Sequence, residues 1–315
     1  MTRPIALTPC EPGGPDPDAV VASIAAWVTS PELIELVGHF GGEIPDASVA
    51  SVLDHLADFS RAWDFRGGTR ERFDTVRVDY DPGLDERLRD LIHVLGLGGA
   101  DRPAHDSYDH VVVLGGGIRV ALGRAEYAAR LLAGGVRAGT VTGLGSLRQR
   151  DDREHREGLR LGLDPFETEA DLMAVGLRRY LGLSEPTAVR EEAGWWHRAW
   201  VNGGRQVHVL AAPSSRPPLR ANTADTLIGW AELVCTPAPT DRVLLVTNAP
   251  YVRHQHCDAV RLLGHRYGCG VETVGYDDLA ARTWGRRPHT TELLQEVRSS
   301  VLATRNLHAA LAVLR

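Results

Sequence analysis

The chain contains no lysine, and its 35 permanently basic side chains are all arginines. This absence excludes a Schiff-base lysine and the lysine of a P-loop, since both need an ε-amino group. Cysteine is also scarce. Cys10, Cys235, Cys257 and Cys269 show no CxxC spacing, which predicts reduced thiols and not a disulfide framework.

Long hydrophobic runs are absent as well. No stretch of about 18 or more apolar residues occurs, and the first twenty residues, MTRPIALTPCEPGGPDPDAV, lack the apolar core of a signal peptide. The net charge of −6 provides no general excess of positive charge for a nucleic acid or a membrane surface. We therefore expect a cytoplasmic globular protein with a small-molecule substrate and with neither nucleic acid nor membrane as a partner.

The residues that are present divide the chain into three predicted parts. Residues 1–104 form an N-terminal arm, loose over 1–16, followed by a helical section over 17–98 with apolar residues at helical spacing. A break at GGADRPAHDS precedes an α/β ligand-binding domain over 105–285. Residues 286–315 form a last helix, roughly 289–314, that is expected to pack on the helical section, and the helical section is the candidate surface for a homodimer.

From Asp109 onward, short β-branched runs alternate with helical segments, which predicts a Rossmann-like three-layer α/β fold with a mainly parallel sheet of about five strands. The expected strands are HVVVL (110–114), GTVT (139–142), VHVLAA (207–212), RVLLVT (242–247) and VETVG (271–275). The segment GWWHRAWVNGGRQVHVLAAP predicts a hairpin that turns at Asn202-Gly203 and adds an antiparallel strand. Its tryptophans, Trp195, Trp196 and Trp200, suit packing on the body of the protein, with a lid or a partner surface as the alternative.

A glycine-rich turn follows the first expected strand. Gly115, Gly116 and Gly117 precede a helix with apolar residues on one face, so free N–H groups and the positive end of the helix dipole would face a ligand. The dinucleotide fingerprint is not met, because Val120 stands at its third glycine and no acidic residue ends the second strand. Another ligand-binding loop, or only a packing corner, remains.

Polar residues follow two further strands, at VTGLGS and VTNAPYVRHQHC, which predicts a cleft at the carboxyl ends of the strands. Asn222 is expected to cap a helix and also to line this cleft. Glu167 suits the first turn of a helix, whereas Glu169 is the better functional candidate. The expected ligand-binding residues are Gly115, Gly116, Gly117, Arg124, Thr142, Gly143, Asn222, Thr223, Asp225, Thr247 and Asn248.

The cluster YVRHQHC places His254, His256 and Cys257 close together. No paired spacing typical of structural zinc and no HExxH motif accompanies it, so no metal is favoured. No G-x-S-x-G motif is present to support a serine hydrolase. Near the cleft, His254 and Tyr251 are the groups suited to moving a proton, and with Glu169 they form the expected catalytic set.

These motifs, in this order, resemble the YdcF/SanA/ElyC family, over about residues 105–285. The resemblance is carried by VVVLGGG (111–117), Arg124, VTGLG (141–145), TEADLM (168–173), NTAD (222–225) and LLVTNAPYVRH (244–254). The family's YH pair is replaced by Pro250-Tyr251, and the hairpin and the segment RQRDDREHREGLRLGLDPF look like insertions. The resemblance implies a Rossmann-like domain and a nucleoside-type ligand, with S-adenosylmethionine as the named cofactor.

The leading hypothesis is an enzyme that binds such a ligand for group transfer or lyase-type chemistry. Gly115–Gly117 and Arg124 would hold a carboxylate or phosphate, while Glu169 or Asp225 would accept from ribose hydroxyls or an ammonium group. The alternatives are a phosphoester hydrolase acting on a nucleotide or sugar-phosphate conjugate, and a non-catalytic binding protein.

Overall fold

A computed structural model describes residues 4–65, 76–98, 102–276, 284 and 287–312. The N-terminal part is helical, and Pro17, Pro31 and Pro82 each occupy the first position of a helix, where a missing N–H costs no hydrogen bond. The preceding Asp or Ser accepts a backbone N–H in each case. The elements are α1 (Pro17–Val28), α2 (Pro31–His39), α3 (Val49–Phe59), the 3-10 turn η1 (Ser60–Trp63), α4 (Pro82–Ile92) and the π-helical turn η3 (His93–Leu97).

The following part alternates strands and helices, and a long helix ends the described chain. Its elements are β1 (Ser107–Val113), α5 (Ile118–Ala133), β2 (Arg137–Ser146), α6 (Asp152–Arg160), α7 (Glu169–Leu181), β3 (Ala188–Glu192), β4 (Trp195–Asn202), β5 (Arg205–Ala212), α8 (Thr223–Leu233), β6 (Arg242–Asn248), α9 (Val252–Ala259), the π-helical turn η4 (Val260–Gly264), α10 (His265–Tyr267), β7 (Gly270–Tyr276) and α11 (Thr290–Ala312).

The seven strands form one mixed sheet in the order β3-β4-β5-β2-β1-β6-β7. The pairs β5-β2, β2-β1, β1-β6 and β6-β7 are parallel, and β3-β4 and β4-β5 are antiparallel. The mixed α/β class expected from the sequence is confirmed; four of the five expected strands lie within observed ones, and the strand expected over 110–114 extends one residue beyond β1. The sequence did not predict β3, so the hairpin region adds two antiparallel strands to the sheet.

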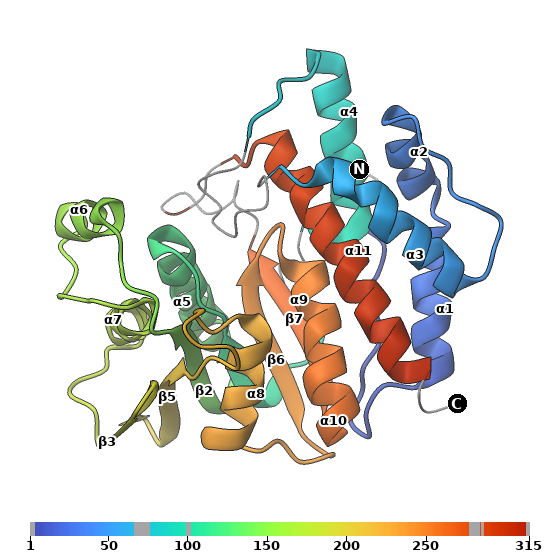
Figure 1. The fold of residues 1–315 in the computed structure, drawn as a ribbon. Helices are drawn as coiled ribbons and strands as arrows, with labels where there is room; N and C mark the ends of the chain where they lie inside the picture. The colour runs from blue at the N-terminus through green and yellow to red at the C-terminus, as the bar shows by residue number, and fades with distance from the viewer. Residues whose placement is uncertain (1–3, 66–75, 99–101, 277–283, 285–286, 313–315) are drawn as a thin grey trace.

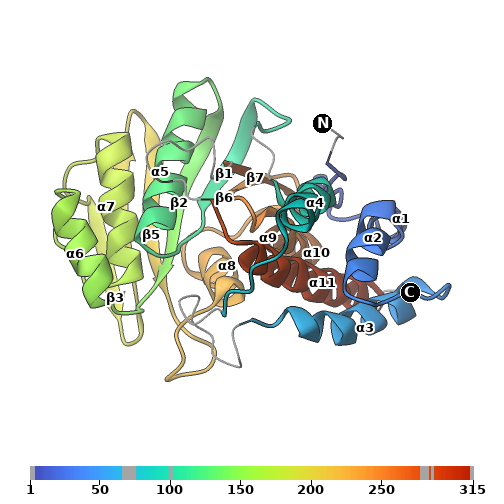
Figure 2. The ribbon, with the colours of Figure 1, turned by 90° about the horizontal axis from the view of Figure 1, so that it is seen from above.

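Helices cover both faces of the sheet (Figures 1 and 2). Helices α5 and α7 lie on one face, while α8, α9 and α11 lie on the other, with α1 to α4 beyond them. The tryptophans of the hairpin are buried, since Trp195 and Trp196 are each 8% exposed and Trp200 is 3% exposed. Trp196 also packs under Arg198, whose guanidinium carbon lies 4.0 Å from the ring centre. The observed burial therefore favours the packing role for these side chains.

The tight turn of the hairpin lies one residue beyond the expected pair. Asn202 pairs with Arg205 in the strand register, so Gly203 and Gly204 form the turn, with φ of 58° and 81°. Both values lie in the left-handed region that glycine adopts at little cost. Asn202 instead donates from its amide to the carbonyl of Leu181 at 2.7 Å, which anchors the hairpin to the end of α7.

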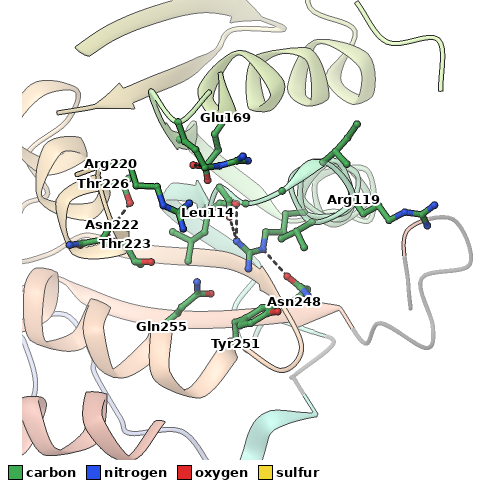
Figure 3. A pocket seen from close by; sticks show the side chains of 18 of the residues that line it. Leu114, Arg119, Glu169, Arg220, Asn222, Thr223, Thr226, Asn248, Tyr251 and Gln255 are labelled. Atoms are coloured by element: carbon green, nitrogen blue, oxygen red, sulfur yellow. Dashed lines mark hydrogen bonds and ion pairs between the residues drawn. The ribbon is translucent and has the colours of Figure 1, made fainter. Parts of the chain in front are cut away.

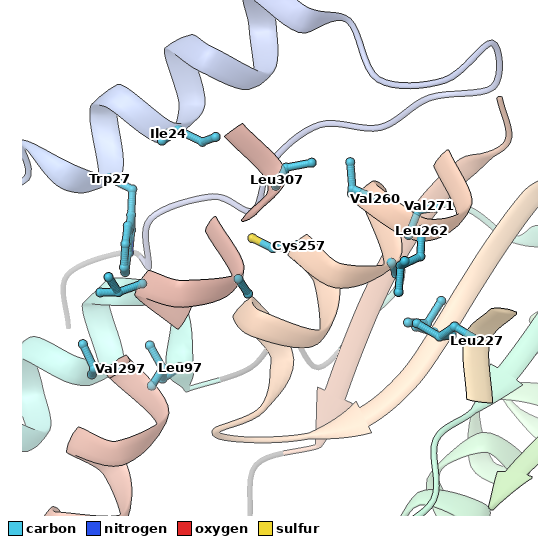
Figure 4. Packing of buried hydrophobic residues seen from close by; sticks show 14 of the residues in the cluster. Ile24, Trp27, Leu97, Leu227, Cys257, Val260, Leu262, Val271, Val297 and Leu307 are labelled. Carbon is cyan, nitrogen blue, oxygen red and sulfur yellow. The ribbon is translucent and has the colours of Figure 1, made fainter. Parts of the chain in front are cut away.

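A continuous core joins the N-terminal helices to one face of the sheet. It includes Ile24 and Trp27 of α1, Cys257 of α9, and Val297 and Leu307 of α11, all buried (Figure 4). Arg305 of α11 bonds Asp54 of α3 at 2.6 Å. The expected last helix thus packs against α3, while positions 313–314 of its predicted span lie outside the described residues. The three-part domain division stays a prediction.

The expectation of a loose arm over 1–16 is wrong for residues 4–16. Ile5 donates to the carbonyl of Val94 at 2.8 Å, and the N–H of Val271 donates to the carbonyl of Cys10 at 2.8 Å. The proline and glycine content suggested a mobile segment, but backbone bonds to distant elements fix it. Residues 1–3, and positions 99–101 of the expected break, lie outside the described residues.

Among the described helices, none alone has the length and hydrophobicity required to cross a membrane. The bent pair α1 and α2, with 43° between the two helices, meets the requirement by length and composition together.

Arg253 links the N-terminal helices to the sheet. Its side chain is buried, and its guanidinium donates to the carbonyls of Leu95 at 2.7 Å, Ile5 at 2.9 Å and Ala6 at 3.0 Å. Leu95 also accepts from the indole N–H of Trp27 at 3.1 Å. Burial lowers the pKa of Arg253 to about 10, so the side chain remains charged at neutral pH and can hold all three carbonyls.

Replacing Arg253 with methionine is expected to lower the free energy of unfolding by about 3 kcal/mol, because three carbonyls lose their charged donor. Urea denaturation measures this change. Arg305→Met is the matched control, since Arg305 is 48% exposed in its ion pair with Asp54, and should cost no more than about 0.5 kcal/mol. Equal effects of the two substitutions would contradict the central role of Arg253.

His256 is a second buried polar residue that ties the N-terminal segment to the sheet. One ring nitrogen, Nε2, lies 2.7 Å from the carbonyl of Thr8, and Nδ1 lies 3.0 Å from the hydroxyl of Thr273. Since a carbonyl only accepts, Nε2 carries the proton and Nδ1 accepts from the hydroxyl. Burial lowers the pKa of His256 from 6.5 to about 4.

Stability is therefore expected to fall as the pH drops from 6.5 to about 4. Over this range the His256 side chain binds a proton in the unfolded chain but stays neutral in the folded one. The free energy of unfolding therefore falls by up to about 1.4 kcal/mol per pH unit. His256→Gln should make the decline shallower in urea denaturation across this range. His155→Gln, at an exposed position of α6, should leave the slope unchanged. Parallel declines in wild type and His256→Gln would sink this prediction.

Candidate ligand-binding site

A pocket of about 1160 Å³ opens at the carboxyl ends of β1, β2 and β6. Its lining combines many charges with apolar side chains such as Leu114, Ile118 and Leu219. Among the described residues it includes the arginines Arg77, Arg119, Arg124, Arg148, Arg153, Arg216 and Arg220, and the glutamates Glu154, Glu157, Glu169, Glu292 and Glu296. The volume suits a small molecule, and the charges suit a polar one.

The predicted glycine loop lines this pocket. Gly117 is the N-cap of α5 and makes no side-chain capping bond, so the first N–H groups of this sixteen-residue helix are directed toward the pocket. Gly115 is needed for close approach: a Cβ atom there would lie 2.6 Å from the carbonyl of Leu144 and 2.7 Å from Oε1 of Glu169. The loop therefore brings backbone and carboxylate together at one point of the pocket.

Arg124 lies beneath the loop and joins the ends of two strands. It is 1% exposed and donates from Nε to Oδ1 of Asn248 at 2.9 Å. It also donates from Nη1 to the carbonyl of Leu114 at 3.2 Å and to that of Gly115 (Figure 3). Arg124 therefore places a positive charge at the carboxyl ends of β1 and β6 and fixes the glycine loop in position.

The segment after β2 and the helices α6 and α7 supply a wall that we call the charged wall, made of Arg148, Glu154 and Glu169. Arg148 bonds both carboxylate oxygens of Glu154, each at 2.8 Å, and its Nε lies 3.9 Å from Oε2 of Glu169. Ser146 donates from its hydroxyl to Oε2 of Glu169 at 2.6 Å. These contacts hold Glu169 at the pocket with its Oε1 beside Gly115.

The rim next to this wall is also ion-paired. Glu157 accepts from Arg160 at 2.7 Å and from Arg119 at 2.8 Å. The bond from Arg160, aided by the charge of Arg119, holds the pKa of Glu157 at about 2. Glu157 is thus ionised throughout the neutral range.

The opposite side of the pocket is formed by amide side chains from α8, α9 and α11. Asn222 accepts the N–H of Asp225 at 3.1 Å, as expected for a helix cap, and Gln255 accepts the hydroxyl of Thr247. Gln295 of α11 accepts the N–H of Phe65 at 3.0 Å. In Figure 3, Asn222 and Gln255 lie across the pocket from Glu169. Amide groups therefore line the side of the pocket opposite Glu169, together with the carboxylates of Glu292 and Glu296.

The expected catalytic residues do not all reach the pocket. Glu169 and Tyr251 line it, on opposite sides in Figure 3. His254 does not line it; its Nδ1 lies 3.5 Å from Oε2 of Glu296, and its ring centre lies 5.9 Å from that of Tyr251. Proton transfer from His254 to a ligand would thus have to pass through Tyr251 or Glu296.

The expected ligand-binding residues divide in the same way. The pocket lining contains Gly115, Gly116, Gly117, Arg124, Asn222, Thr223 and Asn248. Four others lie outside the lining: Thr142 and Gly143, buried in β2; Asp225, in the capping box of α8; and Thr247, which bonds Gln255. Thr247 and Asp225 thus act on residues that do line the pocket.

Several lining residues were not predicted from the sequence. Arg148 and Glu154 lie in the segment interpreted as an insertion, although Asp151 and Glu154 have the spacing of a capping box, which the structure contains. Gln255 and Gln295 carry no local signal, because only the packing of α11 against α9 brings them to one pocket. No group of three or more His, Cys, Asp or Glu residues in the described ranges is placed to hold a metal ion.

Comparison with known proteins gives one family. The model of the Rv3785 N-terminal domain matches residues 11–96, which span α1 to α4. Uncharacterized protein Rv3785 of Mycobacterium tuberculosis is 31% identical over 342 residues, covering 97% of this chain and 94% of the relative. Uncharacterized protein Mb3814 of Mycobacterium bovis matches with the same identity and coverage. No solved structure matches.

The assignment to the YdcF/SanA/ElyC family is therefore wrong. It depended on short glycine-rich and hydroxyl-rich loops after strands, and such loops suit the sheet edge of α/β proteins in general. Arg253, within the LLVTNAPYVRH motif, holds backbone carbonyls outside the pocket. Since the Mycobacterium tuberculosis relative matches along nearly the whole length of both proteins, the chain belongs to the Rv3785 family.

Proposed function

We propose that this chain is an enzyme that binds a nucleoside-type small molecule by an anionic group and carries out group transfer or a lyase-type step on it. The observation that carries the proposal is the charged pocket at the carboxyl ends of the neighbouring strands β1 and β6. Across the sheet, the parallel strands lie in the order β5-β2-β1-β6-β7, which is 3-2-1-4-5 when these strands are numbered along the chain. That order supports a Rossmann-like arrangement, in which ligands bind beside the carboxyl ends of the strands at the point where the strand order reverses, here between β1 and β6.

The anionic group is assigned to the glycine loop. The N-terminus of α5 offers N–H groups without a side-chain cap, and Arg124 adds a positive charge beneath the loop. A carboxylate or a phosphate is stabilised by both features. S-adenosylmethionine, with its carboxylate, remains one candidate, and nucleotides are the other.

Glu169 is assigned to hydroxyl or ammonium groups of the ligand. Ser146 and Arg148 contact its Oε2, and Oε1 lies beside Gly115 in the lining of the pocket. Tyr251, across the pocket, is the group suited to donate or accept a proton. With an acceptor on one side and a phenol on the other, the two residues can act on opposite faces of a bound ligand.

The alternatives have less support. A phosphoester hydrolase that uses His254 would need that residue at the ligand, and His254 lies behind Tyr251 and Glu296. A binding protein that uses the hairpin would need exposed tryptophans, and Trp195, Trp196 and Trp200 are each at most 8% exposed.

Thermal denaturation tests the proposed function directly. We expect S-adenosylmethionine, S-adenosylhomocysteine or a nucleoside monophosphate to raise the melting temperature by a few degrees at about 100 times its Kd. Glu169→Gln keeps the shape of the side chain but removes its charge, and should reduce the ligand-induced rise by at least half.

Glu167→Gln is the matched control, because Glu167 lies two residues away with its side chain 67% exposed. It should show the wild-type response. The proposed function fails if none of these compounds changes the melting temperature of the wild-type protein, or if the Glu169 and Glu167 variants respond alike.

A further inference from the structure

Gln255 and Gln295 are two buried glutamines that line the same pocket. They are 4% and 6% exposed, respectively. In each, the amide oxygen is occupied by a protein donor: the hydroxyl of Thr247 bonds Gln255, and the N–H of Phe65 bonds Gln295 at 3.0 Å. A backbone N–H can only donate, so the orientation of the Gln295 amide is fixed.

The amide of Gln255 is directed into the pocket, and Gln295 lines the same pocket. Within the ranges that the structure describes, neither nitrogen bonds a protein acceptor. Figure 3 shows the amide of Gln255 pointing into the space below Leu114. The two side chains come from neighbouring helices, since α9 and α11 meet where His254 lies 3.5 Å from Glu296. Two neutral amides, one of them fixed in orientation by a backbone N–H, thus line one cavity.

From this geometry we infer that Gln255 and Gln295, the amide pair, determine specificity by donating hydrogen bonds to carbonyl oxygens of the ligand's heterocycle. This inference rests on the proposed function and names the class of base: one with an oxo group, such as hypoxanthine, guanine or uracil. An amino group at the same position, as in adenine or cytosine, is itself a hydrogen-bond donor and could not accept from the amide NH₂ of a glutamine. A buried donor left without an acceptor weakens binding considerably.

Matched ligands test the inference, because inosine and adenosine monophosphates differ chiefly in an oxo or amino group at one ring carbon, as do uridine and cytidine monophosphates. By isothermal titration calorimetry on the full chain, the oxo member of at least one pair should bind about tenfold more tightly. Equal affinities within both pairs, or tighter binding of adenosine monophosphate or S-adenosylmethionine, would overturn the inference and leave the proposed function standing.

Variants connect any such preference to the amide pair. Gln255→Glu keeps the acceptor for Thr247 but replaces the donor with a carboxylate, so the preference for the oxo base should disappear or reverse. Gln295→Met removes the other donor without adding charge beside Glu292 and Glu296, and provides a second route if the first variant does not fold. The control Gln206→Glu, at an exposed position of β5, should keep the wild-type ratio.

Two further results are informative. If both glutamine variants fold and retain the wild-type ratio of affinities, the preference comes from other residues and the inference is wrong. If the wild-type protein binds none of these nucleotides and no S-adenosylmethionine, the proposed function fails, and the inference fails with it.

Discussion

The arrangement of the whole molecule depends on one buried cation, Arg253. A guanidinium cannot be left unbonded in an apolar core, so its carbonyl partners must converge on one point. Those partners come from the N-terminal segment and from the turn after α4, while Arg253 itself lies on α9. Because α9 begins at the carboxyl end of β6, the same contact sets the distance between the helical layer and the sheet edge. The pocket occupies the space that results.

Within that space, the two sides of the pocket follow different electrostatic rules. On one side, Arg148 is neutralised by carboxylates, which keeps a dense set of charges compatible with partial burial. On the other side, the neutral amides of Gln255 and Gln295 use their oxygens inside the protein, and Glu292 and Glu296 line the pocket beside them. A ligand that fits both sides must combine an ionic or hydroxylated part with a neutral part rich in acceptors. Nucleotides have this composition.

Local patterns in the sequence were sufficient for much of the fold and for part of the site. β-branched runs marked the five parallel strands, and Asn222 was recognised as a cap because its partners lie within the next turn of helix. Gln295 could not be recognised in this way, since its role requires α11 to pack near strand ends far away in the sequence. Short loop motifs also gave the wrong family. Glycine-rich loops such as the one around Gly115 follow strands at the sheet edge of many unrelated α/β proteins.

Glu154 has two structural duties that cannot be separated. Its Oε2 accepts the N–H of Asp151 at 3.3 Å, completing the capping box of α6, and Oε1 and Oε2 both accept from Arg148. The folding of this short helix and the polarity of the pocket are thus one cooperative event. Mutagenesis at Glu154 would confound loss of helix with loss of ligand, and a change at Arg148 would reach the same cap through the Glu154 carboxylate. A change in the N-terminal turn of α6 would therefore alter the charge lining the cavity as well as the stability of the helix.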